Sequence, residues 1–311
     1  MTHGTLRAAV IGFDNTIYGE THAEAFLADL PHGPVEPGVR MLDDVLAAAG
    51  MSRRDLACAV LGVPMPVKSG AGAVPLPPPR SANAFQALPG WADADPAKPL
   101  SEELGVPAWC ENDANLAALG EMNEGAGLGL SHFIYIKIAQ GVGSGIIVNR
   151  QVCRGSSGLA GEMLHLHVRE TGPICMCGGR GCLITEADSS ITDIVQPAHP
   201  EKLTIHTVFA MAGSGDVGAN RALRDFGTLL GRPLADLCVF LNLEAIIIDG
   251  LLGEAAHPVI DGVRAAIDRY AYPRIAADVR IVPGALGERA ELVGCASFAR
   301  ERLAADLTLV G

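Results

Sequence analysis

Residues 158–182 read GLAGEMLHLHVRETGPICMCGGRGC, a stretch that places three of the chain's eight cysteines within eight positions. A histidine stands ten positions before the first of these cysteines. One imidazole and three thiolates form the tetrahedral ligand set of a closed, structural zinc site. Three glycines among the last five residues let the backbone turn tightly enough for such ligands to converge on one ion. The stretch therefore predicts a structural zinc ion bound by His165, Cys175, Cys177 and Cys182.

Two alternatives to this zinc site stay open at the level of the sequence. The three cysteines could be reduced thiols in a loop, because C-x-C is a less usual ligand spacing than C-x-x-C. His167 is a rival ligand to His165. Leu166 and Val168 flank His167 in strand-like alternation, which predicts that its side chain points to the opposite face.

The composition indicates a well-packed globular protein of two domains. Apolar residues make up 49% of the 311 positions and charged residues 19%. A net charge of −12 without a local cluster of lysine and arginine argues against direct nucleic-acid binding. The five other cysteines stand singly among apolar neighbours, and neither a signal peptide nor a membrane-spanning apolar run is visible. We therefore expect reduced thiols, a cytoplasmic location and no membrane partner.

The hydrophobic pattern predicts an α/β protein, because strands alternate with helices along the chain. A hairpin is expected over residues 6–21, and residues 64–89 are expected to form a loop rich in proline and glycine. Further strands are predicted at residues 57–63, 107–110, 133–138, 146–148, 245–248 and 279–282. Helices are predicted at residues 39–49, 100–104, 112–121, 220–241, 258–270 and 290–304.

A glycine-rich segment lies between two of these strands. Its residues Gly141, Gly143, Ser144 and Gly145 leave backbone N–H groups free to approach an anion such as a phosphate closely. The alternative is a tight hairpin that needs glycine for its geometry alone.

The segment Glu111-Asn112-Asp113-Ala114-Asn115 contains a candidate catalytic acid. Asp113 begins a helix directly after a strand, where open α/β sheets place their ligands. A carboxylate there can accept a proton from a sugar hydroxyl as general base, while Asn112 bonds a neighbouring hydroxyl. Simple helix capping by both residues is the alternative. Glu162 is similarly ambiguous, since it is either a solvated acid or an acceptor for sugar hydroxyls.

Several ordered motifs together resemble the ROK family of repressors, open reading frames and sugar kinases over nearly the whole chain. They are LGVPMPV from Leu61, LPGW from Leu88, ENDAN from Glu111, GVGSG from Gly141, GLAGEMLH from Gly158, CMCGGRGC from Cys175, LNLEAIIIDG from Leu241 and LGERAELVGC from Leu286.

This resemblance implies an actin/hexokinase-like (ribonuclease H-like) fold of two α/β domains with sugar bound between them. The implied domains are residues 1–107, completed by a C-terminal helix over residues 295–311, and residues 108–294 with a zinc loop at 158–186. Asp113 would be the catalytic base of a kinase, and a homodimer or tetramer is expected. The implied sugar contacts are Asn112, Asp113, Glu162 and His165, and zinc would fix the loop that presents the last two.

Four departures from the family pattern bear on activity. The Asp-x-Gly-x-Thr phosphate loop of family kinases is represented only by Gly4-Thr5, which weakens the expectation of ATP binding. Ile184 replaces a sugar-binding glutamate, and Gln140 replaces a threonine of the second phosphate loop. Leu164 stands where glycine usually separates Glu162 from His165, and it would displace the histidine if that backbone required glycine.

These departures favour a sugar-sensing protein of the regulator type, without its DNA-binding domain, over an active kinase. The segment YAYPRIAADVRIVPGALGERAELVG from Tyr270 looks closer to actinobacterial regulators of the family than to its kinases. The alternative is an ATP- and magnesium-dependent hexose kinase similar to glucokinase or N-acetylglucosamine kinase, with Asp113 as base.

Overall fold

The computed structural model describes residues 5–25, 30, 32–68, 72–73, 95–139, 141–175, 177–250 and 252–308. Within these residues strands and helices alternate along the chain, which confirms the predicted α/β class. Three positions singled out in the sequence, Gly4, Leu88 and Gln140, lie outside the described residues. None of the helices in the described part of the chain combines the length and apolar character needed to cross a bilayer.

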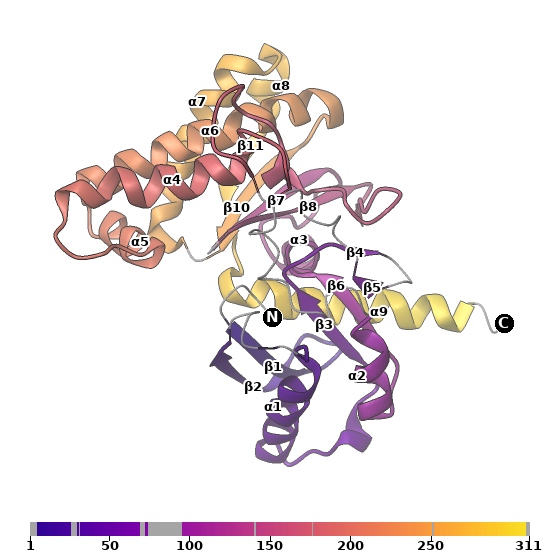
Figure 1. Cartoon of the computed structure of the whole chain (residues 1–311). Helices are drawn as coiled ribbons and strands as arrows, with labels where there is room; N and C mark the ends of the chain where they lie inside the picture. Colours follow the sequence, from indigo (N-terminus) through magenta and orange to yellow (C-terminus); the bar gives the residue numbers. More distant parts are fainter. Residues whose placement is uncertain are drawn as a thin grey trace.

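The described residues of the first third of the chain form three separate two-stranded sheets and two helices (Figure 1). The predicted hairpin is present as an antiparallel pair, and two later strands pair in parallel. The elements are β1 (Thr5–Ile11), β2 (Ile17–Glu24), α1 (Val35–Ala48), β3 (Ala59–Val63), α2 (Ala97–Leu104) and β6 (Ala108–Asn112). The proline-rich segment expected to be a loop contains a short antiparallel pair, β4 (Val67–Lys68) and β5 (Gly72–Ala73).

A five-stranded sheet with the order β11-β10-β7-β8-β9 organises the rest of the molecule. Its strands are β7 (Phe133–Ile138), β8 (Val142–Val148), β9 (Gln151–Val152), β10 (Ala245–Gly250) and β11 (Arg280–Pro283). Strands β7, β10 and β11 run parallel, while β8 and β9 run antiparallel to their neighbours. Every residue of the central strand β7 is buried, because helices cover both faces of the sheet.

Alternate side chains of β7 enter two different cores, as the two-residue period of a strand requires. Ile134 and Ile136 pack with the helices of one face, and Phe133 and Tyr135 with those of the other. The first face carries α4 (Leu183–Val195), α5 (Ile205–Gly213), α6 (Val217–Leu241) and α7 (Ala256–Tyr270), with α8 (Pro273–Asp278) following. The second face carries α3 (Asp113–Glu124) and α9 (Ala290–Thr308).

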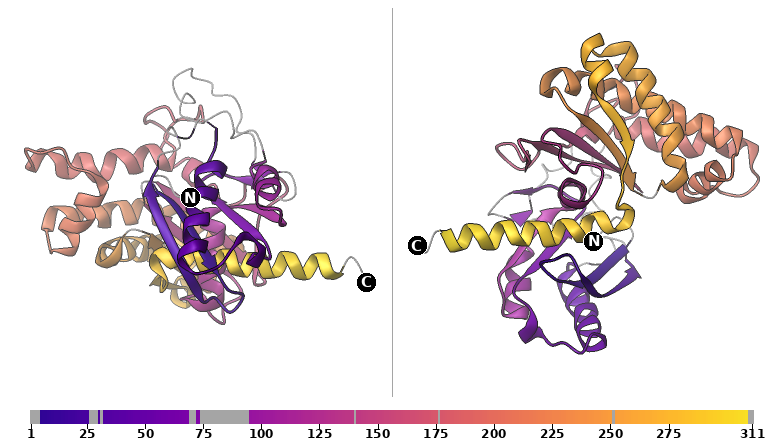
Figure 2. Two further views of the ribbon diagram at one scale, coloured as in Figure 1. Left: turned by 90° about the horizontal axis from the view of Figure 1, so that it is seen from below. Right: turned by 180° about the vertical axis from the view of Figure 1, so that it is seen from behind.

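Helix α9 crosses between the β1–β2 hairpin and the five-stranded sheet (Figures 1 and 2). It packs against α3 so closely that a Cβ atom added at Gly294 would lie 1.8 Å from the carbonyl oxygen of Leu116. The helix begins at Ala290, where the hydrophobic pattern predicted it, and Ala290 packs in the core shared with α3.

Three helices, α4, α5 and α8, were not predicted. Helix α4 has the sequence LITEADSSITDIV, whose β-branched and hydroxyl residues have low intrinsic helix propensity. It starts at Leu183, within the segment 158–186 that the sequence analysis expected to be the zinc loop. Short 3₁₀ turns complete the structure: η2 (Arg53–Asp55), η4 (Met163–His165), η5 (Gln196–Ala198), η6 (Gly253–Ala255) and η7 (Gly287–Arg289).

Candidate functional site

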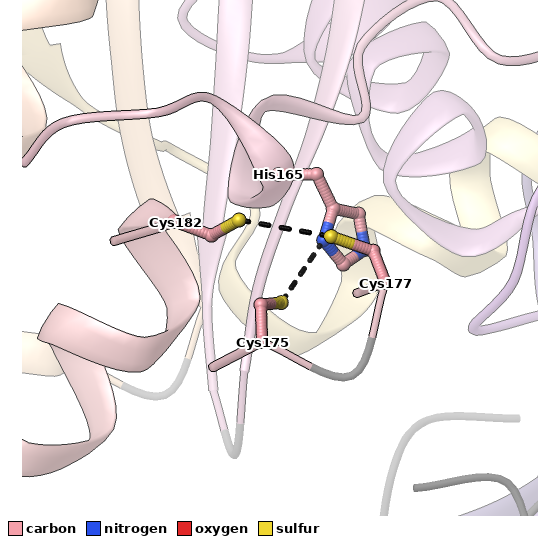
Figure 3. A group of neighbouring side chains, drawn as sticks. All are labelled: His165, Cys175, Cys177 and Cys182. Carbon is pink, nitrogen blue, oxygen red and sulfur yellow. Dashed lines mark hydrogen bonds between the residues drawn. The ribbon is translucent and has the colours of Figure 1, made fainter. Parts of the chain in front are cut away.

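The four predicted metal ligands converge at one point of the structure (Figure 3). His165 lies in the η4 turn, and the three cysteines lie on the loop that leads into α4. The imidazole Nδ1 of His165 is 3.5 Å from the Sγ atom of Cys175, and the Sγ atoms of Cys177 and Cys182 are 3.7 Å apart. All four potential ligand atoms lie within 4.8 Å of one another. The group could therefore hold one metal ion.

The geometry of this cluster fits zinc. Zinc–sulfur bonds of about 2.3 Å and zinc–nitrogen bonds of about 2.0–2.1 Å, in tetrahedral arrangement, place two sulfurs about 3.8 Å apart and sulfur and nitrogen about 3.5 Å apart. The two separations of 3.5 and 3.7 Å match these values, while 3.7 Å is far longer than a disulfide bond. Burial lowers the pKa of His165, which favours the neutral imidazole that binds metals.

Glycines shape the loop as its sequence suggests. Gly178 and Gly181 adopt positive φ angles of 84° and 64°, and a Cβ at Gly181 would lie 2.0 Å from the carbonyl oxygen of Arg169. Among the described residues the cluster takes His165 and not His167, whose backbone instead forms a bridge with Cys182. Leu164 lies within η4 and is not among the residues of positive φ, so it does not require the glycine-only backbone considered from the sequence.

Asn112 and Asp113 lie at the junction of β6 and α3. The Oδ1 atom of Asn112 accepts hydrogen bonds from the backbone N–H groups of Ala114 and Asn115 at 3.0 and 3.1 Å, so Asn112 is the N-cap. Its amide nitrogen donates to the carbonyl of Met65. The helix cap that the sequence analysis gave as the alternative role of Asn112 is thus present. The amide oxygen of Asn112 is engaged by the helix, and one of its two amide N–H donors is engaged by Met65.

Asp113 is buried and faces a lysine that the sequence analysis did not single out. Lys137 on β7 donates from Nζ to Asp113 Oδ2 at 2.6 Å and also to Glu291 Oε1 on α9. Burial by itself lowers the pKa of Lys137, but the charges of Asp113 and Glu291 outweigh it and raise the pKa above its usual value. Lys137 is therefore a buried ammonium ion shared by two carboxylates. The signal in the sequence was a single charge inside the apolar strand FIYIKI.

Glu162 lies near Asp113, in the turn before η4. Burial, together with the charge of Asp113, raises the pKa of Glu162 to about 7. The turn is held to strand β8, because Ser144 donates from Oγ to the carbonyl of Gly161 at 2.5 Å. Gly161 has a φ of 96°, and a Cβ atom added there would lie only 2.8 Å from the carbonyl oxygen of Ser144. Glu162 is thus a half-buried acid in a fixed turn, not a freely solvated one.

The glycine-rich segment is mostly strand instead of loop. Gly143, Ser144 and Gly145 belong to β8 and pair with Lys137, Ile136 and Tyr135 of β7, while Gly141 precedes the strand. A Cβ at Gly145 would lie 2.6 Å from the carbonyl oxygen of Ala114 and 2.7 Å from Ala118 Cβ. Glycine is needed there because α3 packs directly on β8. Phosphate binding by these residues stays a prediction.

A second buried ion pair fixes the strand that leads to Asp113. Glu111, 2% exposed, accepts from Arg154 Nε at 2.7 Å and Nη2 at 2.6 Å. Its other oxygen accepts from the backbone N–H of Asn112 and the amide of Asn115. Sequence reasoning did not assign this role to Glu111, because Arg154 is 43 positions away.

Comparison with known proteins identifies the family of this chain. Residues 19–302 match the sequence profile of the ROK family. The chain belongs to the ROK family. Members similar to it include the xylose repressor of Bacillus spizizenii, 32% identical over 68% of this chain and 55% of the repressor, and the glucokinase of Halalkalibacterium halodurans, 35% identical over 66% of this chain and 67% of the enzyme. The chain thus spans about half the length of the xylose repressors it matches.

Solved structures of ROK proteins share the fold, which is the actin/hexokinase-like fold expected from the resemblance. A ROK transcriptional regulator, a homolog of the E. coli MLC protein, superposes with a TM-score of 0.76 at 23% identity, covering 96% of this chain and 75% of that one. A Streptomyces griseus ROK glucokinase, crystallised with glucose and AMPPNP, gives 0.75 at 25% identity and covers 97% of both chains. The relatives therefore include both regulators and sugar kinases.

Proposed function

We propose that this chain is a sugar-binding ROK protein of the regulator type, which holds a hexose beside Asp113 without phosphorylating it. The observation that carries this proposal is the engagement of the Asp113 carboxylate. Oδ2 accepts from the Lys137 ammonium group at 2.6 Å, and Oδ1 accepts from the backbone N–H of Ala114 at 2.8 Å.

A carboxylate held in this way is a poor general base. Proton transfer needs an oxygen whose charge is available to the sugar hydroxyl in the transition state. Lys137 Nζ already donates to one oxygen of Asp113 and the Ala114 N–H to the other, so a sugar hydroxyl would share either oxygen with a donor of the protein. The same carboxylate can still accept a hydrogen bond from a hydroxyl through a remaining lone pair. The site would therefore bind the sugar without taking a proton from its hydroxyl group.

The neighbouring groups support a weak sugar site. Asn112, Glu162 and His165 are the further contacts we propose, with zinc on the cysteine cluster fixing the last two and His165 Nε2 left to face the sugar. Ile184, in the first turn of α4, cannot replace the glutamate expected there. The loss of one charge-assisted hydrogen bond, worth roughly 1.5–3 kcal/mol, weakens affinity by about one to two orders of magnitude.

The second candidate is an ATP-dependent hexose kinase with Asp113 as base. It is favoured by the 35% identity to a glucokinase and by the closeness of Glu162 to Asp113. In that case ATP and magnesium are required, with Gly141, Gly143, Ser144 and Gly145 beside the phosphates. Engagement of Asp113 by Lys137 counts against it.

Two assays separate these candidates. Calorimetry with glucose, N-acetylglucosamine and xylose is expected to show weak binding that is lost in Asp113→Ala and kept in Asp225→Ala, an exposed acid on α6. A coupled ADP-release assay with the same sugars is expected to show no turnover. Turnover near one per second that vanishes in Asp113→Ala would establish the kinase instead.

The assembly and location that go with this function are also proposals. A homodimer or tetramer acting in the cytoplasm fits a metal cluster that needs reduced thiols. We propose that these residues do not contact nucleic acid directly, since the net charge is −12. The division into two domains, residues 1–107 and 108–294, stays a prediction from the family resemblance.

A further inference from the structure

The metal cluster has one ligand that solvent reaches. All eight cysteines lie in the described part of the chain, and Cys177 alone among them is exposed. Cys175 and Cys182 are 1% and 3% exposed. Oxidation of a cysteine requires a thiolate and access to it, and a cysteine that binds a metal ion is a thiolate. An oxidant dissolved in water therefore meets the cluster first at Cys177.

A second thiol stands within reach of Cys177. The Sγ atoms of Cys177 and Cys182 face one another at 3.7 Å (Figure 3). A shift of under about 2 Å brings the two sulfurs to bonding distance. The sulfur of Cys175 is instead 3.5 Å from Nδ1 of His165. Cys182 is thus the thiol placed to react with an oxidised Cys177.

Gly179 leaves this pair of sulfurs uncovered. Its backbone N–H donates to Cys177 Sγ at 3.4 Å, which fixes the exposed sulfur at the turn. A Cβ atom added at Gly179 would lie 3.2 Å from Cys182 Sγ and 3.3 Å from Cys177 Sγ. A side chain at this position would therefore lie against both sulfurs, and glycine keeps that space open.

We propose that Cys177 and Cys182 are a modification site, at which a peroxide converts the two zinc-bound thiolates into a disulfide and releases the metal ion. The Cys177 thiolate attacks one oxygen of hydrogen peroxide. The O–O bond breaks, an S–O bond forms, and the hydroxide that leaves takes a proton from water. The product is a sulfenic acid on Cys177.

The second step closes the disulfide. The Cys182 thiolate attacks the sulfur of the sulfenic acid, so that an S–S bond forms and the S–O bond breaks. A second hydroxide leaves and is protonated. The two thiolates together lose two electrons, which reduce one hydrogen peroxide to two waters.

Disulfide formation removes two of the four metal ligands. Only His165 and Cys175 remain, and a structural zinc site needs four. Glu162 is the N-cap of the η4 turn that contains His165, so metal release frees the segment that carries both. The consequence for sugar binding rests on the function proposed above, while the oxidation itself does not.

Zinc release from the whole, zinc-loaded chain tests the pair. Hydrogen peroxide is added, free zinc is followed with a chromogenic chelator, and linked peptides are identified by mass spectrometry. We expect about one zinc ion per chain to be released, together with a peptide pair that joins Cys177 to Cys182. Dithiothreitol and added zinc should restore the loaded protein.

Three variants locate the reaction, each checked for bound zinc before peroxide is added. Cys177→His keeps four ligands but has no thiol at this position, and it should release zinc at least about tenfold more slowly. Gly179→Ala keeps all four ligands, covers the pair with a methyl group, and should slow release at least about threefold. Cys58→Ser, which changes a half-buried thiol outside the cluster, should release zinc at the unmutated rate.

The same measurements can overturn the proposal. Zinc retained under peroxide, release without a disulfide, or a disulfide that excludes Cys177 would each do so. If Cys177→His does not load zinc, an unchanged rate in Gly179→Ala decides against the pair. Failure of the proposed function is distinguishable, because a reduced, zinc-loaded chain that binds no sugar leaves the release of zinc measurable.

Discussion

At the scale of single residues, the cysteine cluster gives the first prediction. We expect about one zinc ion per chain in metal-replete protein. Cys175→Ser should lose the metal, loosen the loop around Glu162 and abolish sugar binding, because structural zinc contributes directly to folding. Cys58→Ser, which removes a half-buried thiol outside the cluster, should keep the zinc. Elemental analysis giving clearly under half an equivalent of zinc for the unmutated chain would contradict the assignment.

The lysine beside Asp113 gives a prediction of stability. Lys137→Met leaves the carboxylates of Asp113 and Glu291 without their buried cation, which is expected to cost about 3–5 kcal/mol. Lys98→Ala removes an exposed lysine on α2 and should change the free energy of unfolding by less than about 0.5 kcal/mol. Urea unfolding measures both. A loss below 1 kcal/mol in Lys137→Met would mean that water reaches Asp113.

Asp249, at the end of β10, is expected to make the free energy of unfolding depend on pH. Burial and the charge of Glu121 raise its pKa from 3.8 to about 6, against hydrogen bonds from the Tyr135 hydroxyl and from backbone N–H groups of residues 250 and 287. The folded state therefore holds a proton between pH 4 and 6 that the unfolded state has released, so stability falls as pH rises through this window. Asp249→Asn removes this dependence.

The size of the Asp249 effect follows from the pKa difference of about two units. Relative to the unmutated chain, Asp249→Asn should gain up to about 3 kcal/mol between pH 4 and pH 7. Urea unfolding of both proteins at the two pH values gives the double difference, in which the titration of other groups cancels. A difference near zero would show that Asp249 is hydrated.

At the scale of elements, the contact between β8 and α3 predicts the effect of one methyl group. Gly145→Ala places a Cβ within 2.7 Å of two atoms of α3, and such overpacking costs about 1–3 kcal/mol. Because α3 begins with Asp113, a displacement of α3 by the added methyl group should also weaken sugar binding. Gly38→Ala in α1 meets no atom within 4 Å and should stabilise the protein by about 0.5–1 kcal/mol. Thermal unfolding and calorimetry compare the two, and equal midpoints would refute the packing role of Gly145.

At the scale of the whole molecule, we expect a symmetric dimer or tetramer. Large apolar side chains are left on the surface of the chain, among them Phe240 and Tyr272, which are 84% and 64% exposed. Exposed apolar groups of this size are typical of contacts between subunits when they gather into a patch. Sedimentation velocity at micromolar concentration measures the mass. A monomer there would contradict the expectation.

The sequence by itself determined what depends on local pattern. The strand at residues 133–138, the hairpin and the helix cap at Asn112 follow from periodicity and from residue types within a few positions. The convergence of His165 with three cysteines was predictable because all four lie within 18 positions and glycines between them allow the turn. The ordered motifs were sufficient for the family.

Only the tertiary structure decided which partners meet across long separations. Lys137 is 24 positions from Asp113 and 154 from Glu291, and no local pattern joins the three. Likewise, Gly145 belongs to a segment with the composition of a phosphate loop, and only the structure shows that the approach of α3 requires glycine at this position. Propensity also missed α4, which packs against the buried sheet despite poor helix formers. Burial and long-range contacts override local preference because they carry more free energy than propensity does.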